Sequence, residues 1–143
     1  MTIAAILRGK GAEVISIAPD ASVADAVTLL ATKRIGAVPV VDGQGALLGI
    51  FSERDVIHCL QAKGAGALSG TVAEAMTAPA IAVSPEQPVI AALSMMTQRR
   101  FRHLPVVDQG RLIGFVSIGD LVKHRIDRIE ADAAAMRDYI QSA

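Results

Sequence analysis

The fold is decided by Ile15 to Asp42, ISIAPDASVADAVTLLATKRIGAVPVVD, because this stretch occurs a second time in the same chain. The second copy is Ile81 to Asp108, IAVSPEQPVIAALSMMTQRRFRHLPVVD, and it aligns with the first without a gap. Both copies end in Pro-Val-Val-Asp. An internal repeat of this size fixes the architecture before any single motif is considered, because each copy must form the same supersecondary unit.

The repeat extends in both directions from this stretch. Downstream, LLGIFSERD (47–55) matches LIGFVSIGD (112–120), and upstream, TIAAIL (2–7) matches TVAEAM (71–76). Glycine and serine between the copies are typical of a linker. We therefore expect four segments: a first unit at 2–63, a linker at 64–70, a second unit at 71–125 and a helical extension at 126–143.

The hydrophobic pattern predicts the same order of elements in both units. A short strand (14–17 or 81–83) ends near a proline, and a helix follows that begins at Ser22 or Pro88. A β-hairpin comes next, formed in the first unit by 37–41 and 47–51. Ser52 or Ser117 then caps a closing helix. The predicted order is strand, helix, strand, strand, helix, twice.

Size and composition favour one shared core. The chain has 143 residues, of which 52% are hydrophobic, and it contains no Trp. A unit of about 60 residues buries too little apolar surface alone, so the two units are expected to pack sheet against sheet about a pseudo-twofold axis, as an α/β (α+β) fold. Fourteen acidic residues balance fourteen basic ones, which favours neither nucleic acid nor a membrane as partner. The single Cys59 and the lack of an apolar leader or membrane-spanning run predict a cytoplasmic protein.

The repeated Val-Pro-Val-Val-Asp, turn, Leu-Leu-Gly-Ile-Phe-Ser-x-x-Asp pattern resembles the tandem cystathionine-β-synthase (CBS) domain pair, or Bateman module, over nearly the whole chain. More narrowly, it is similar to stand-alone bacterial CBS-pair proteins, which carry no catalytic domain. The resemblance implies a regulatory module that binds AMP, ATP, NAD or S-adenosylmethionine. We expect AMP or NAD, a homodimer and an unknown protein partner.

The resemblance also implies a role for particular residues. Asp55 and Asp120 would hold the ribose hydroxyls, and Ser52 and Ser117 would lie beside the ribose or phosphate. The phosphate would be bound by Arg102, His103 and Arg54. Copy one has Gly36 and Ala37 where copy two has Arg102 and His103, which puts a second phosphate-bearing ligand in doubt. The adenine would be bound by two segments, about 10–15 in one copy and 76–81 in the other. The residues singled out are Lys10, Gly11 and Ala12 in the first and Met76, Thr77, Ala78, Ala80 and Ile81 in the second.

The carboxylates can be interpreted without the family. A carboxylate one turn into a helix has two acceptor oxygens for the two hydroxyls of a ribose, and the helix N-terminus favours a phosphate nearby. The alternative is that Ser-x-x-Asp is only a capping box, and the same residues can serve both roles. Arg99 and Arg100 are explained by a helix C-terminus. His58 and His124 have no partner at metal-ligand spacing, so we expect no metal.

The tail continues the last helix from Leu121 to Ile140, and its apolar residues recur at helical spacing. This stripe is expected to pack either on a second chain, which we prefer, or back onto its own chain.

The sequence lacks the motifs of common enzyme classes, so catalysis is not expected and no catalytic residue or cofactor is predicted. The alternative to a nucleotide sensor is a ligand-free dimeric interaction module.

Overall fold

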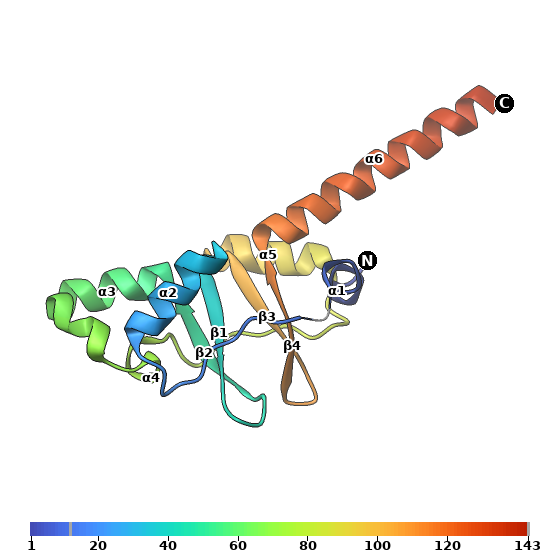
Figure 1. The fold of residues 1–143 in the computed structure, drawn as a ribbon. Coiled ribbons are helices and arrows are strands. Elements are labelled where there is room, and N and C mark those ends of the chain that lie inside the picture. The colour runs from blue at the N-terminus through green and yellow to red at the C-terminus, as the bar shows by residue number, and fades with distance from the viewer. Residues whose placement is uncertain (12, 143) are drawn as a thin grey trace.

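The computed structural model of the protein describes residues 1–11 and 13–142. Two β-hairpins lie next to each other in the middle of the molecule, with most of the helices toward their upper ends and their turns projecting below (Figure 1). The elements are α1 (Ile3–Lys10), α2 (Val23–Lys33), β1 (Ala37–Val41), β2 (Leu47–Ser52), α3 (Glu53–Lys63), the 3₁₀ helix η1 (Gly64–Ser69), α4 (Val72–Ala75), α5 (Val89–Arg99), β3 (His103–Asp108), β4 (Arg111–Ser117) and α6 (Ile118–Ser142).

The two hairpins confirm the predicted repeat. β1 pairs with β2 and β3 pairs with β4, both antiparallel, and the register is equivalent: Pro39 lies opposite Ile50, and Pro105 lies opposite Phe115. Each hairpin turns at a glycine with positive φ, Gly45 in the first and Gly110 in the second, a conformation that glycine adopts without strain. Equivalent residues in the two copies therefore occupy equivalent places.

The predicted first strands are much shorter than expected. Of residues 14–17 and 81–83, only Ile17 and Val83 make ladder contacts, each as an isolated parallel bridge to the first strand of its hairpin. Ile17 N–H, for example, donates to Pro39 O at 3.0 Å. Pairing ends here because a proline follows two residues later in each copy and has no N–H to donate.

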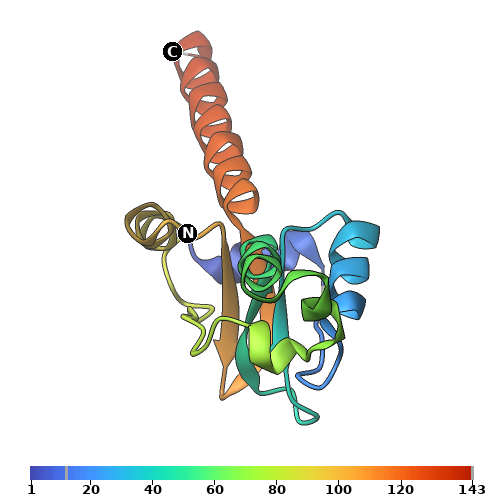
Figure 2. The same ribbon diagram turned by 90° about the vertical axis from the view of Figure 1, so that its left-hand side faces the viewer.

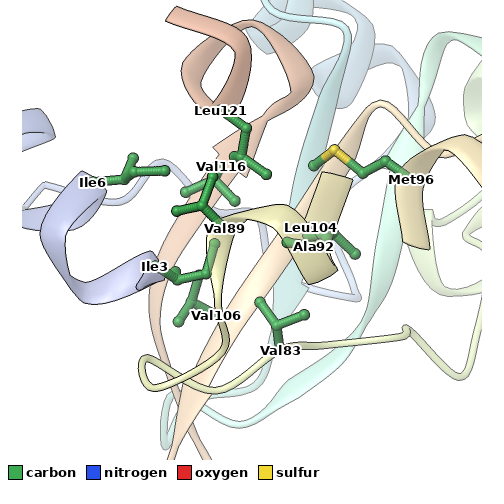
Figure 3. Close-up of a cluster of buried hydrophobic side chains, with 10 residues drawn as sticks. All are labelled: Ile3, Ile6, Val83, Val89, Ala92, Met96, Leu104, Val106, Val116 and Leu121. Carbon is green, nitrogen blue, oxygen red and sulfur yellow. The ribbon is translucent and has the colours of Figure 1, made fainter. Parts of the chain in front are cut away.

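The core of the second unit is completed by the first helix of the chain. Ile3 and Ile6 of α1 are buried with Val89 and Met96 of α5 and with Leu104 of β3 (Figure 3). The backbone fixes this docking, since Ile3 N–H donates to Gln87 O at 2.9 Å. α1 thus belongs to the first unit in sequence but packs on the core of the second.

The first unit is completed in the same way by α4, which belongs to the second unit in sequence. Val72 of α4 is fully buried with Val23 and Leu30 of α2 and Phe51 of β2. Val72 N–H donates to Ala21 O at 2.8 Å, which reproduces the bond of Ile3. The two units therefore exchange their first helices. Within the expected linker at 64–70, Gly64–Ser69 form the 3₁₀ helix η1, in which Ala67 is buried.

The last helix, α6, is continuous from Ile118 to Ser142 and extends away from the rest of the molecule (Figures 1 and 2). Its start is anchored by Leu121, which is fully buried in the second core. From Arg125 onward every described residue except the half-buried Ala134 is exposed. The stripe does not fold back on its own chain, so the intrachain packing considered as an alternative is not observed.

Candidate functional site

A cavity of about 380 Å³ lies where the two units meet. Its walls come from the segment that leaves α1, from the end of α2 and start of β1, and from β3 and β4. Its lining residues include Lys10, Glu13, Arg34, Gly36, His103 and Phe115. Pockets of this volume are typical of small-molecule sites.

Asp120 does not itself line this cavity, but it lies beside it, bonded to the lining residues Lys10 and Ser117. Lys10 Nζ donates to Asp120 Oδ2 at 2.7 Å and to the carbonyl oxygen of Phe115 at 2.7 Å. The same carboxylate accepts Ser117 N–H at 2.9 Å, as part of the helix cap. Partial burial acts to raise the pKa of Asp120, but the hydrogen bonds from Lys10 and Ser117 outweigh it and leave the pKa below its usual value. Asp120 is therefore ionised at neutral pH.

His103 lines the same cavity and is stacked on Phe115, with ring centroids 5.4 Å apart and planes within 8°. Burial lowers the pKa of His103 below its ordinary value, and the Lys10 ammonium and Arg102 lower it further, although Asp120 and Glu53 act in the opposite direction. The imidazole is therefore neutral at pH 7 and could gain a proton if an anion entered the cavity.

Asp55, the counterpart of Asp120, has a different environment. It is only 8% exposed. Its Oδ1 accepts Thr77 Oγ1–H at 2.8 Å, and its Oδ2 accepts the backbone N–H of Ser52 at 2.9 Å and its hydroxyl at 3.1 Å. Both oxygens are therefore engaged within the protein, and Asp55 forms the capping box of α3.

The two carboxylates differ in what covers them. Thr77 N–H donates to Ile50 O at 2.8 Å while the Thr77 hydroxyl binds Asp55. At the other site the Lys10 ammonium makes both of the equivalent bonds, to Phe115 O and to Asp120. Thr77, which binds Asp55, is thus held by backbone hydrogen bonds to Ile50. Lys10, which binds Asp120, contributes only its long side chain, which is 42% exposed. Only the Lys10 side chain can therefore move away from its carboxylate without breaking backbone hydrogen bonds.

The structure brings together some of the predicted site residues and separates others. Lys10, Gly11, His103 and Ser117 line the cavity. Arg102 and Arg54 are exposed and lie outside its lining. Ala12 lies outside the described residues. Of the second adenine segment, Met76 and Thr77 pack beside Asp55 and Gly49, whereas Ala78, Ala80 and Ile81 do not line the larger cavity.

Sequence reasoning missed one charged residue of the cavity, Arg34, whereas Glu13 lies in the predicted adenine segment at 10–15. Arg34 ends α2 in the left-handed conformation, with φ of 55°, and this turn directs the chain into the cavity wall. Its counterpart Arg100 ends α5 with φ of 59°. The equivalence of Arg34 and Arg100 in the repeat is the sequence signal that points to Arg34.

A second cavity of about 300 Å³ lies between α3, η1 and α4. Asp55, His58 and Cys59 border it, and its lining residues all belong to the half of the molecule built around the first core. Cys59 is partly buried, and its thiol donates to Val56 O at 3.3 Å. Among residues 1–11 and 13–142, no helix combines the length and apolar character needed to cross a membrane.

Comparison with known proteins identifies the family. The model of the CBS domain matches the chain twice, at residues 11–62 and 72–127. The chain belongs to the CBS-domain family. Both CBS matches leave out the exchanged helix α1, and the second ends inside α6. A similar curated relative is the CBS domain-containing protein YhcV of Bacillus subtilis, which is 31% identical over 85% of this chain and 86% of its own length.

Solved structures of CBS proteins share the whole fold. The CBS-domain containing protein ATU1752 from Agrobacterium tumefaciens superposes with a TM-score of 0.82 at 39% identity, over 87% of this chain and 99% of that chain. CBSX2, crystallised in complex with AMP, superposes with a TM-score of 0.77 at 27% identity, over 88% of this chain and 96% of its own. The expected fold, two pseudo-twofold CBS units with an extended last helix, is thereby confirmed.

Proposed function

We propose that this CBS pair binds one adenine nucleotide, AMP or NAD, in the cavity beside Asp120 and acts as a non-enzymatic regulatory module. The observation that carries the proposal is the Lys10–Asp120 pair, an ionised carboxylate covered by one displaceable side chain at the edge of a cavity of about 380 Å³. The complex of CBSX2 with AMP supports the class of ligand. S-adenosylmethionine and ATP share the adenosine and are less preferred.

The ribose would take the place of the lysine. Two hydroxyls of a cis-diol can donate to Asp120 as the ammonium does, and a carboxylate offers enough lone pairs for both. Lys10 is then free to turn toward a phosphate, since its ammonium lies on a long, flexible stem. The start of α6, with Ser117 at its cap, adds the free N–H groups of a helix N-terminus.

The remaining parts of the nucleotide would contact the other walls. Gly11 and residues 13–15 line the cavity, and their backbone groups can bind the edge of an adenine. His103 and Arg34 supply the cationic groups for a phosphate. The predicted phosphate role of Arg102 and Arg54 requires their exposed side chains to fold over the cavity. Asp55, with both oxygens engaged, would remain structural.

Regulation would follow from the position of the cavity. Its walls come from both units, so a bound nucleotide stabilises one relative arrangement of the two and can change the surface that a protein partner contacts. We infer a homodimer in the cytoplasm as the working form. The exposed apolar face of α6 supports the homodimer.

The test is a binding titration by calorimetry with AMP, NAD, ATP and S-adenosylmethionine on the wild type and on Asp120→Asn. We expect Asp120→Asn to weaken binding of the preferred ligand by roughly 10- to 100-fold, because hydrogen bonds to a charged group contribute about 1.5–3 kcal/mol. Asp55→Asn is the matched control, and it should reduce stability while leaving affinity nearly unchanged. Equal losses of affinity for both variants would contradict a single site at Asp120.

The second candidate is a ligand-free interaction module, and one observation favours it. Lys10 already satisfies Asp120 without any ligand. In that case none of the four ligands would bind or raise the unfolding temperature at millimolar concentration. Lys10→Met separates the two functions, because it should tighten nucleoside binding if the lysine competes with the ribose and should only destabilise the protein if the pair is structural.

Binding is also expected to depend on pH through His103. The pKa of His103 is lowered in the free protein, and a phosphate beside the imidazole would raise it, so a proton is taken up on binding. The affinity for AMP should therefore increase as the pH falls from about 8 to about 6.5, whereas the affinity for adenosine should stay constant. Calorimetry in buffers of different ionisation enthalpy measures the proton directly. In His103→Asn the pH dependence should disappear; its persistence would place the proton elsewhere.

A further inference from the structure

The outer part of α6 carries an exposed apolar stripe with a strict heptad spacing. Val122, Ile126, Ile129, Ala133, Met136 and Ile140 follow one another at alternating intervals of four and three residues. The large residues among them are between 42% and 65% exposed. This spacing is that of the a and d positions of a coiled coil, with Ile126, Ala133 and Ile140 at a and the other three at d.

The charges beside the stripe select the orientation of a partner helix. The g positions are Arg125 and Asp132, and the e positions that follow them by five residues are Glu130 and Arg137. In a parallel, in-register pair, position g of one helix lies next to the following e of the other. Arg125 then faces Glu130 of the second copy and Asp132 faces Arg137, so four opposite-charge pairs form across the seam and no like-charge pair forms.

An antiparallel pair fits less well. In the antiparallel register that pairs the whole stripe of one helix with the whole stripe of the other, Glu130 lies beside Glu130 of the second copy and Asp132 lies beside Asp132. Both are like-charge pairs. If the second helix is shifted by one heptad toward its C-terminus, opposite charges come together. Met136 then lies opposite Gly119, and Ile140 extends beyond the start of the partner's helix at Ile118. Only the parallel register combines a fully paired stripe with matched charges.

The charged residues are available for this pairing. All four are exposed, and within the described part of the outer helix the one ion pair, between Arg128 Nε and Asp132 Oδ1, is 3.9 Å long and open to solvent. Pairs of this kind contribute little to stability, so Asp132 can exchange Arg128 for Arg137 of a second copy at small cost.

We propose that the stripe on α6, Val122 to Ile140, joins two copies of this chain as a parallel, in-register, two-stranded coiled coil. The inference rests on the homodimer proposed above and gives it a specific interface. Because α6 leaves the body only at its first turns, both CBS bodies would lie at the same end of the coil (Figure 1). A partner or ligand would therefore meet two modules side by side.

The first experiment measures the mass of the full chain by sedimentation equilibrium. The wild type should sediment at twice the 14.9 kDa of one chain. Ile129→Glu, a change at an exposed seam position, should sediment as a monomer, whereas Ala131→Glu, with the same charge on the outer face, should remain a dimer. A monomeric wild type would overturn the homodimer itself; a dimeric Ile129→Glu would leave the homodimer and overturn the coiled coil.

The second experiment tests the orientation. Arg125→Glu should weaken the dimer by setting two acidic residues together, and the double variant Arg125→Glu, Glu130→Arg should restore it in the parallel register. In the shifted antiparallel register the double variant would instead set the new carboxylate at position 125 near Asp132 and the new guanidinium at position 130 near Lys123, and the dimer would be lost. Restoration supports the parallel form, and loss overturns it. Circular dichroism of each variant checks that α6 stays helical.

Discussion

Ile3→Ala is expected to lower the free energy of unfolding by about 2–5 kcal/mol, the range for truncating a buried isoleucine to alanine. Ile3 belongs to the first helix of the chain, which precedes the first CBS match. It is nevertheless fully buried in the core of the second unit, among Val89, Leu104 and Val106. Urea unfolding followed by circular dichroism measures the change.

The control is Ile90→Ala, the same substitution at a residue that is 61% exposed on α5. Away from a core, such a change should alter stability by no more than about 0.5 kcal/mol. Amide hydrogen exchange shows which core is weakened. Ile3→Ala should reduce the protection of the amides in β3 and β4 more than that of the amides in β1 and β2. If the two variants had the same stability, α1 would not contribute to the second core.

Gly49→Ala is expected to destabilise the protein by about 1–3 kcal/mol through overpacking. A Cβ atom at Gly49 would lie 2.7 Å from the carbonyl oxygen of Thr77 and 2.8 Å from Met76 Sδ. The carbonyl belongs to the backbone that pairs with Ile50, at 3.0 Å and 2.8 Å, so it cannot move without breaking that pairing. The Thr77 hydroxyl would also lose its position beside Asp55.

The equivalent substitution, Gly114→Ala, provides the comparison. Its Cβ would lie 2.5 Å from Leu7 Cδ2, the end of a flexible side chain rather than backbone. Leu7 can rotate, so the loss of stability should be clearly smaller than for Gly49→Ala. Because Leu7 and Gly114 both line the larger cavity, this variant should change nucleotide affinity more than Gly49→Ala does. An equal or larger loss of stability for Gly114→Ala would contradict this difference between the two sites.

The repeat was sufficient to predict the hairpins, their turns and the caps of the helices, because these depend on residues close together in sequence. Ser22 caps α2 by accepting Asp25 N–H, and Ser52 forms the capping box with Asp55, as the pattern indicates. The exchange of α1 and α4 could not be predicted from the repeat. The two helices are equivalent in sequence, so the pattern alone does not say which of two similar cores each one completes.

The site was predictable only in part for a related reason. Arg102 and His103 are neighbours in sequence, but Arg102 lies just before β3 and His103 is its first residue. The structure places His103 in the cavity wall and leaves Arg102 exposed outside it, a difference that the sequence motif does not reveal. The Lys10–Asp120 pair spans 110 residues and has no counterpart in the second copy, where position 79 is a proline. No local pattern could reveal it.

The exchanged helices have a consequence for how such a chain can arise. A single unit expressed alone, such as residues 71–125, keeps its own helix α4 but lacks the helix that fills its core. Two such units can complete each other by trading these helices, which is the arrangement of a domain-swapped dimer. A gene encoding one unit would therefore yield a functional fold only as a pair. Fusion of two copies preserves that dimer within one chain, and the two halves can then diverge in sequence. In this chain, Lys10 binds the carboxylate of Asp120, whereas Thr77 binds that of Asp55.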